Sequence, residues 1–210
     1  MIKFIIAYDD NEKEDLSIFF KTCAQELIAR LNLEIHEFIE WNHTNKYLNE
    51  IYIDIFLNNI PYTPFVFLSY SHGSEDSLVG ENLPYLSVRS NLDAFKNSLF
   101  YTFSCSSGKL LGQKLLEKGC TSFIGYKNDI FFAAPYLAEF VECSNSGIYS
   151  LLNGENVAVA LRIMLDTHNK KIDELYQDNF FVASVIRDNR DSLIHYGNKD
   201  AKIDDFAFGQ

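Results

Sequence analysis

The sequence predicts an α/β fold built on an open sheet with buried parallel strands. Two apolar runs, residues 65–71 and 99–104, have the length and the aromatic and aliphatic bias of such strands, and small loop-forming residues follow each of them. A third run at residues 2–8 precedes a stretch whose apolar residues recur every three or four positions. That spacing is typical of a helix covering one face of a sheet.

In the N-terminal half, turn residues, alternation and helical spacing predict the elements. The first strand is closed by Asp9-Asp10-Asn11, and apolar residues from 16 to 31 keep helical spacing. Alternation of apolar and polar residues at 33–40 predicts a half-exposed or edge strand. The remaining predictions are a helix at 47–57, a turn at Pro61 and Pro64, a hairpin at 77–86 turning at residues 80–82, and a helical piece at 88–96.

In the C-terminal half, capping residues mark helix ends. A helix at 110–116 is ended by Gly119, and Asn156 is placed to cap a helix that runs to about His168. The other predicted elements are a strand at 120–125, a helical region at 132–142 and a short last strand at 192–197.

The composition is that of one domain spanning residues 1–210, with 47% hydrophobic residues available for a core. A net charge of −11, with acids spread along the chain, argues against a nucleic-acid-binding surface, which needs clustered Lys and Arg. The four cysteines show no Cys-x-x-Cys spacing and no secretory signal opens the sequence, so we expect free thiols in the cytoplasm. No apolar stretch reaches the roughly 18 residues of a membrane span, so no membrane partner is expected.

A histidine and a cysteine stand where the two central apolar runs end. His72-Gly73 follows the first run, and Cys105-Ser106-Ser107-Gly108 follows the second. Chemistry collects at the carboxyl ends of strands in an open α/β sheet, so the two side chains are candidates for a Cys-His dyad. In such a dyad the imidazole lowers the thiol pKa towards or below neutrality. No ligand-spaced partner competes for either residue as a metal ligand, and no cofactor is expected.

These two motifs, Phe-Leu-Ser-Tyr-Ser-His-Gly and Phe-Ser-Cys-Ser-Ser-Gly, resemble the catalytic motifs of caspase-like cysteine peptidases. Segments 119–125, 154–160 and 194–203 follow in the order seen in the CHAT and gingipain branch of that clan, although Lys199 stands where the branch has Pro. The resemblance implies a caspase-like three-layer α/β/α sandwich with a mostly parallel central sheet. It also implies a cysteine endopeptidase acting on a protein substrate.

The resemblance assigns roles to individual residues. Cys105 would attack the peptide carbonyl, His72 would protonate the leaving amine, and the N–H groups of Gly73 and Cys105 would hold the oxyanion. Fewer residues separate His72 from Cys105 than the roughly 50 of caspases, so the intervening loop is trimmed. Glu75 and Asp76 are close enough in sequence to orient the imidazole, although a solvated acidic loop is the plainer interpretation.

The same resemblance implies an S1 pocket formed by Asp9, Asp10, Phe103 and Ser104. Phe103 and Ser104 stand where caspases have Gln-Ala before the nucleophile. The acidic pair disfavours Asp at P1 by like-charge repulsion, and a basic P1 residue ranks slightly ahead of Leu or Met. Asp129 is expected at the same rim of the sheet, as a cleft residue or a plain turn residue.

Alternatives from other classes stay open. Residues 65–72 followed by Glu75 and Asp76 also resemble the opening strand of a TIR domain, a signalling or NAD-cleaving module. Against this, a βαβ stretch precedes that strand, and the Trp-Cys-x-x-Glu segment of catalytic TIR helices is absent. A third hypothesis is a caspase-like domain that only binds. If the protein is a peptidase, we expect a separate protein to present its substrate or release its inhibition, because no recruitment module is evident.

Overall fold

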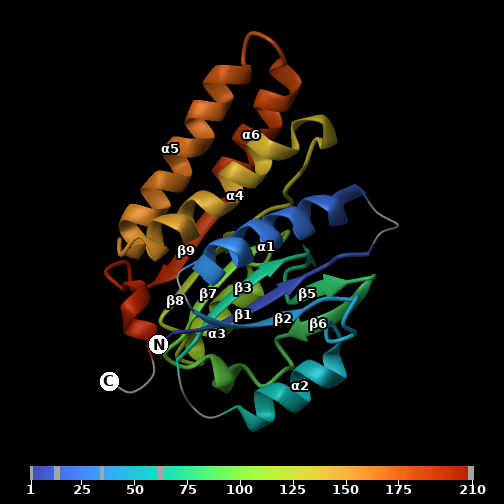
Figure 1. The fold of residues 1–210 in the computed structure, drawn as a ribbon, viewed down its shortest axis with the longest axis vertical. Coiled ribbons are helices and arrows are strands. Elements are labelled where there is room, and N and C mark those ends of the chain that lie inside the picture. The colour runs from blue at the N-terminus through green and yellow to red at the C-terminus, as the bar shows by residue number, and fades with distance from the viewer. Residues whose placement is uncertain (1, 12–14, 34–35, 61–63, 208–210) are drawn as a thin grey trace.

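Six short segments pair into one sheet (Figure 1). The computed structural model describes residues 2–11, 15–33, 36–60 and 64–207. The strand order is β2-β1-β3-β7-β8-β9; neighbours are parallel except for β8 and β9. The strands are β1 (Lys3–Tyr8), β2 (Glu37–Trp41), β3 (Val66–Tyr70), β7 (Leu99–Phe103), β8 (Ser122–Tyr126) and β9 (Leu193–Gly197).

Helices cover both faces of this sheet, because successive side chains of a strand point in opposite directions and both sets are apolar here. One face packs under α1 (Asp15–Leu33) and α4 (Leu137–Leu152), with α5 (Val157–Leu175) and α6 (Phe180–Ser192) completing the cluster. The other face packs against α2 (Glu50–Asn59) and α3 (Leu110–Glu117). The protein is therefore an α/β structure with three layers and a mostly parallel mixed sheet (Figure 1).

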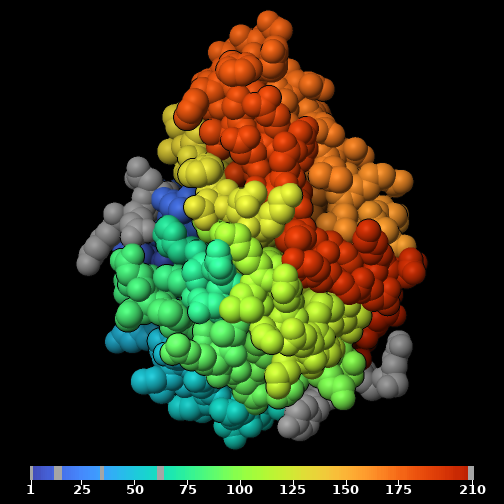
Figure 2. Space-filling model, turned by 180° about the vertical axis from the view of Figure 1, so that it is seen from behind, coloured from blue at the N-terminus to red at the C-terminus, as the bar shows by residue number. Residues whose placement is uncertain are grey.

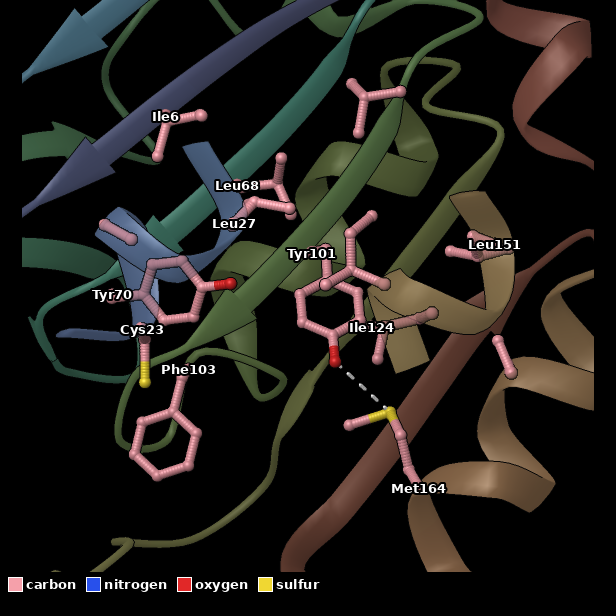
Figure 3. Packing of buried hydrophobic residues seen from close by; sticks show 14 of the residues in the cluster. Ile6, Cys23, Leu27, Leu68, Tyr70, Tyr101, Phe103, Ile124, Leu151 and Met164 are labelled. Atoms are coloured by element: carbon pink, nitrogen blue, oxygen red, sulfur yellow. Dashed lines mark hydrogen bonds between the residues drawn. The ribbon is translucent and has the colours of Figure 1, made fainter. Parts of the chain in front are cut away.

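In the core under α4, the hydroxyl groups of two buried tyrosines bond to that helix (Figure 3). Tyr70 of β3 donates its hydroxyl to the Asn145 side chain at 2.7 Å. Tyr101 of β7 donates to the Ser144 carbonyl at 2.7 Å, and its hydroxyl also lies 3.5 Å from the Met164 sulfur. Because a buried hydroxyl without a partner costs free energy, these bonds fix how α4 lies across the sheet.

A second, small antiparallel sheet lies between β3 and β7 in the chain. It consists of β4 (His72–Gly73), β5 (Ser77–Gly80) and β6 (Leu83–Ser87). The predicted hairpin and its turn are confirmed, with Glu81 and Asn82 at positive φ angles of 47° and 66°. The short strand β4 was not predicted, and it brings His72 and Gly73 into this sheet.

Several predicted elements need correction. The helical piece expected at 88–96 is confirmed only in part: that stretch holds the single-turn 3-10 helix η1 (Leu92–Phe95). Side-chain bonds explain the difference, since the Ser87 N–H donates to Ser90 Oγ and the Arg89 N–H donates to Ser87 Oγ. The edge strand begins at Glu37 rather than residue 33, and residues 34–35, like Pro61, lie outside the described residues.

The C-terminal helices also differ from the prediction. The region expected at 132–142 opens as a 3-10 turn, η2 (Ala134–Tyr136), which contains Pro135, and α4 begins only after it. Helix α5 is capped by Asn156 as predicted but continues well past His168. Helix α6 was not predicted. No helix in the described part of the chain has the length and apolar character needed to cross a bilayer.

Candidate active site

The strand ends that carry His72 and Cys105 lie side by side, as predicted. Strands β3 and β7 are parallel neighbours, and their last paired residues are Tyr70 and Phe103. The Ser71 N–H donates to the Phe103 carbonyl at 3.3 Å, which extends the pairing by one residue. His72 and Cys105 each follow two positions after this last pair. The two residues therefore occupy equivalent places at the carboxyl edge of the sheet.

Gly73 brings the two motifs into backbone contact. A Cβ atom at this position would lie 2.6 Å from the Cys105 carbonyl oxygen and 2.9 Å from Ser104 Cβ. Contacts that short do not occur for real side chains, so only glycine fits at position 73. Strand β4 consequently lies flush on the backbone that carries the thiol.

The turn after Cys105 has a strained backbone, and residues of the loop after β8 hold it in place. Ser106 has a φ of 54°, in the left-handed region that non-glycine residues seldom adopt. Its N–H donates to the Asn128 carbonyl at 3.0 Å, and its hydroxyl donates to Asp129 at 3.2 Å. Strained backbone persists where surrounding contacts enforce it, and such positions cluster at functional sites. Asp129 thus lies beside the turn, as expected for a residue at this rim.

Within the part of the chain that the structure describes, the Cys105 thiol forms hydrogen bonds to one residue, Ile130. The Ile130 N–H donates to Cys105 Sγ at 3.4 Å, and the thiol donates to the Ile130 carbonyl at 3.7 Å. Burial raises the pKa of this thiol above its ordinary value, and the Asp129 charge raises it further, while the Ile130 hydrogen bond opposes both effects. Among the described residues no imidazole–thiol hydrogen bond is formed. The expected lowering of the thiol pKa by His72 is therefore wrong for this state of the protein.

His72 is half-buried on β4, with its ring edge-on to Phe20 of α1 at a centroid distance of 5.5 Å. The two acids that follow His72 in the sequence, Glu75 and Asp76, bond to other residues. Glu75 forms an ion pair with Lys109 at 2.7 Å, and Asp76 accepts a hydrogen bond from Ser74. In this structure neither carboxylate orients His72.

Asp9 and Asp10, expected in the S1 pocket, are buried and already bonded to the chain itself. Asp10 accepts hydrogen bonds from the N–H of His43 at 2.7 Å and from the N–H and hydroxyl of Thr44. Asp9 accepts from the N–H of Glu81 at 3.3 Å, and its carboxylate lies 3.2 Å from His43 Nε2. The two acids hold the loop after β2 and the tip of the β5–β6 hairpin in place.

The other two S1 candidates are buried as well. Phe103 packs its ring against Phe19 and Tyr126 at centroid distances of 4.9 and 5.1 Å. Ser104 has no exposed surface, and its hydroxyl accepts a hydrogen bond from Thr102. A substrate side chain could reach these residues only if neighbouring loops moved. The S1 assignment stays a prediction.

Sequence reasoning gave no role to His43, Ile130 or Asn189. His43 lines a cleft of about 490 Å³ together with Lys46, Leu48, Ile51, Gly80, Glu81 and Leu83. Ile130 acts through its backbone and Asn189 lies on the helix that was not predicted, so no residue-type signal marked either. The remaining thiols, Cys23, Cys120 and Cys143, are buried as packed side chains.

The comparison with known proteins assigns this chain to no family. No protein-family model matches the chain, and neither does any curated protein. Within the described residues, no group of three or more His, Cys, Asp or Glu side chains is placed to hold a metal ion. The site must therefore be interpreted from its own geometry.

Proposed function

We propose that this protein is a cysteine endopeptidase with a caspase-like fold, in which Cys105 is the nucleophile and His72 the general acid and base. The observation that carries the proposal is the register of β3 and β7, which sets His72 and Cys105 at equivalent positions on neighbouring strand ends. The contact of Gly73 with the Cys105 backbone supports the same pairing.

The reaction would proceed in two stages. His72 takes the thiol proton, and the Cys105 thiolate attacks the peptide carbonyl to form a tetrahedral intermediate. When the C–N bond breaks, the imidazolium gives its proton to the leaving amine, and a thioester remains on Cys105. Water, deprotonated by His72, then attacks the thioester and releases the carboxylic acid and the thiol.

The oxyanion would be held by main-chain N–H groups. The Cys105 N–H lies close enough to its own sulfur to favour the thiolate, and within the described residues it donates to no carbonyl. Gly73, flush against the same backbone, is the second donor that the resemblance implies.

A caspase-like domain that only binds is the second candidate, and one observation favours it. The thiol is half-buried, bonded to Ile130, and its pKa is raised by burial. In a domain that only binds, the thiol is not a nucleophile and can stay buried. The TIR-like hypothesis has less support than the other two. Strands β1 and β2 pair into the same sheet as β3, so residues 65–71 are not the first strand of the fold.

Peptidyl acyloxymethyl ketones with Lys, Leu or Asp at P1 test the proposal on the full chain. These probes alkylate a cysteine nucleophile that recognises the peptide, and mass spectrometry locates the adduct. We expect an adduct on Cys105 with the Lys and Leu probes, no adduct in Cys105→Ala, and unchanged labelling in Cys120→Ala.

Two outcomes would change the account. If no peptidyl probe modified Cys105 faster than the same electrophile without a peptide, the binding-only function would replace the peptidase. If the Asp probe reacted best, the peptidase would stand and the acidic S1 assignment would fall.

A further inference from the structure

In the loop between β8 and α4, the backbone of one residue, Ile130, bonds to the Cys105 thiol. Ile130 supplies both the N–H that donates to Cys105 Sγ and the carbonyl that accepts from the thiol. The Ile130 side chain is 9% exposed and belongs to the core cluster under α4. A thiol is a weak donor and a weak acceptor, so these two bonds alone hold the loop poorly. The buried Ile130 side chain contributes part of the hold on the loop, and a polar contact at Phe131 contributes the rest.

Asn189 of α6 supplies that polar contact. Its Oδ1 accepts from the Phe131 N–H at 2.9 Å, and its Nδ2 donates to the Phe131 carbonyl at 2.7 Å. The side chain is 1% exposed, and both ends of its amide are used on the residue next to Ile130. A buried amide that loses such partners is costly, so Asn189 and the loop stay together.

Phe131 itself contributes little packing to this contact. Its side chain is 57% exposed, although phenylalanine is among the residues most often buried. Its neighbours on either side do pack: Ile130 lies in the core cluster, and Phe132 stacks on Phe19 at a centroid distance of 4.9 Å. The hold on Phe131 itself is polar and passes through the backbone.

The two ends of the loop are bonded separately to the last residue and the N-cap of α6. The Lys127 N–H donates to the Ser192 carbonyl at 2.8 Å, and Asn179 donates to the Tyr136 hydroxyl at 2.9 Å. Figure 2 shows the yellow stretch after β8 beside the red helix α6. Because both ends have their own ties, the loop stays attached to α6 when the Asn189 contact is lost.

We propose that Asn189 is a positioning residue for Cys105, holding the Ile130–Phe131 peptide as a cap over the thiol, and that lifting this cap exposes the nucleophile. The cap has a regulatory meaning only if Cys105 is the nucleophile, so this assignment rests on the proposed function. A partner that displaced the cap would switch the enzyme on.

The test measures access to the thiol rather than peptidase activity. Iodoacetamide needs no peptide recognition, and peptide mapping separates Cys105 from the three buried cysteines. We expect Cys105 in Asn189→Ala to be alkylated about tenfold to thirtyfold faster than in the wild type, the effect of losing one or two ordinary hydrogen bonds. Asn189→Asp keeps an acceptor for the Phe131 N–H but loses the donor, so its rate should be intermediate.

Asn145→Ala is the matched control. Asn145 is also a fully buried amide, but it bonds to Tyr70, Tyr149 and the Cys23 carbonyl, away from the loop. Its loss should lower stability without changing the Cys105 rate. Equal Cys105 rates in the wild type and both Asn189 variants would overturn the cap. Faster alkylation in Asn145→Ala as well would show that the rate reports only general loosening.

Hydrogen exchange on the unmodified protein keeps the test decisive if Asn189→Ala does not fold. The Ile130 and Phe131 amides should open together, and Cys105 should be alkylated only from that open state. A wild-type alkylation rate above the one allowed by the measured opening would contradict the cap. Because this readout involves no cleavage, a failed cap and a failed peptidase assignment are told apart.

Discussion

Cys105 is held by neighbours from distant parts of the chain. Gly73 abuts its backbone from β4, and Ile130 bonds its sulfur from the loop after β8. The position of the thiol at a strand end follows from the apolar run that precedes it. Its bonding does not, because Ile130 acts through backbone atoms that every residue possesses.

His168 gives a prediction about acid stability. It is 1% exposed on α5, its Nδ1 lies 2.7 Å from the Met164 carbonyl, and burial lowers its pKa to about 4. The unfolded chain binds this proton near pH 6.5, so the stabilising effect is complete above that pH and is lost as the pH falls towards 4. Between pH 7.5 and 4.5 the loss should be about 2 to 3 kcal/mol of unfolding free energy.

Urea unfolding of His168→Gln at the two pH values measures this contribution. The variant has no group to titrate there, so its stability should fall less on acidification than that of the wild type. His195→Gln is the comparison variant: burial lowers the pKa of His195 to about 4 as well, but this ring is only half-buried, so solvent screening should make its contribution smaller. An equal loss in His168→Gln and the wild type would show that other groups cause the acid sensitivity.

Histidines illustrate the limit of prediction at this scale. His72 could be singled out because it ends an apolar run. His43 could not, because its place 3.2 Å from the Asp9 carboxylate depends on how the loop after β2 packs. Neither the residue type of His43 nor its neighbours in the sequence predict that contact.

At the level of elements, strands were easier to predict than helices. Buried parallel strands are short continuous apolar runs, and the runs at 2–8, 65–71 and 99–104 each contain one. Helix α6 has a mixed pattern: Val182, Ala183 and Ile186 face inward, but Phe180 and Phe181 are exposed at its start and the polar Asn189 is buried. Exposed aromatic residues and a buried amide interrupt the apolar stripe by which a helix is predicted. That is why the residue proposed to hold the cap escaped prediction.

Strand β4 gives a prediction at this scale. In Gly73→Ala the new methyl group would meet the Cys105 carbonyl at 2.6 Å, so β4 must shift off the backbone that carries the thiol. We expect labelling of Cys105 by the best peptidyl probe to fall at least tenfold, with a loss of about 1 to 3 kcal/mol in unfolding free energy. Labelling kinetics and urea unfolding measure the two effects.

Gly154→Ala is the matched control for this substitution. Its Cβ would meet nothing within 4 Å, but its φ of 87° is unfavourable for alanine, so stability should fall by about 1 kcal/mol. Labelling should be unchanged. If Gly73→Ala and Gly154→Ala both labelled at the wild-type rate, the contact of β4 with the Cys105 backbone would not matter for the reaction of the thiol.

At the level of the whole molecule, the parallel sheet gathers the chemistry at one edge. The residues that follow β1, β3, β7 and β8 include Asp9, His72, Cys105 and Asp129. Two apolar cores, one on each face, hold these strands in register, so the site is built on rigid elements. Helices α4, α5 and α6 extend from one side of this body (Figure 1), and α6 reaches the loop over the thiol.

The central claim is that His72 and Cys105 act as a pair, and one measurement tests it most directly. The rate at which the best peptidyl probe modifies Cys105 should be compared in the wild type, His72→Ala and His195→Ala, each with and without Asn189→Ala to lift the cap. Without His72 the thiol has no base, so the rate should fall about 100-fold or more in both backgrounds. His195 lies on β9 at the edge of the sheet, so its loss should leave the rate unchanged. Equal rates with and without His72 would contradict the account.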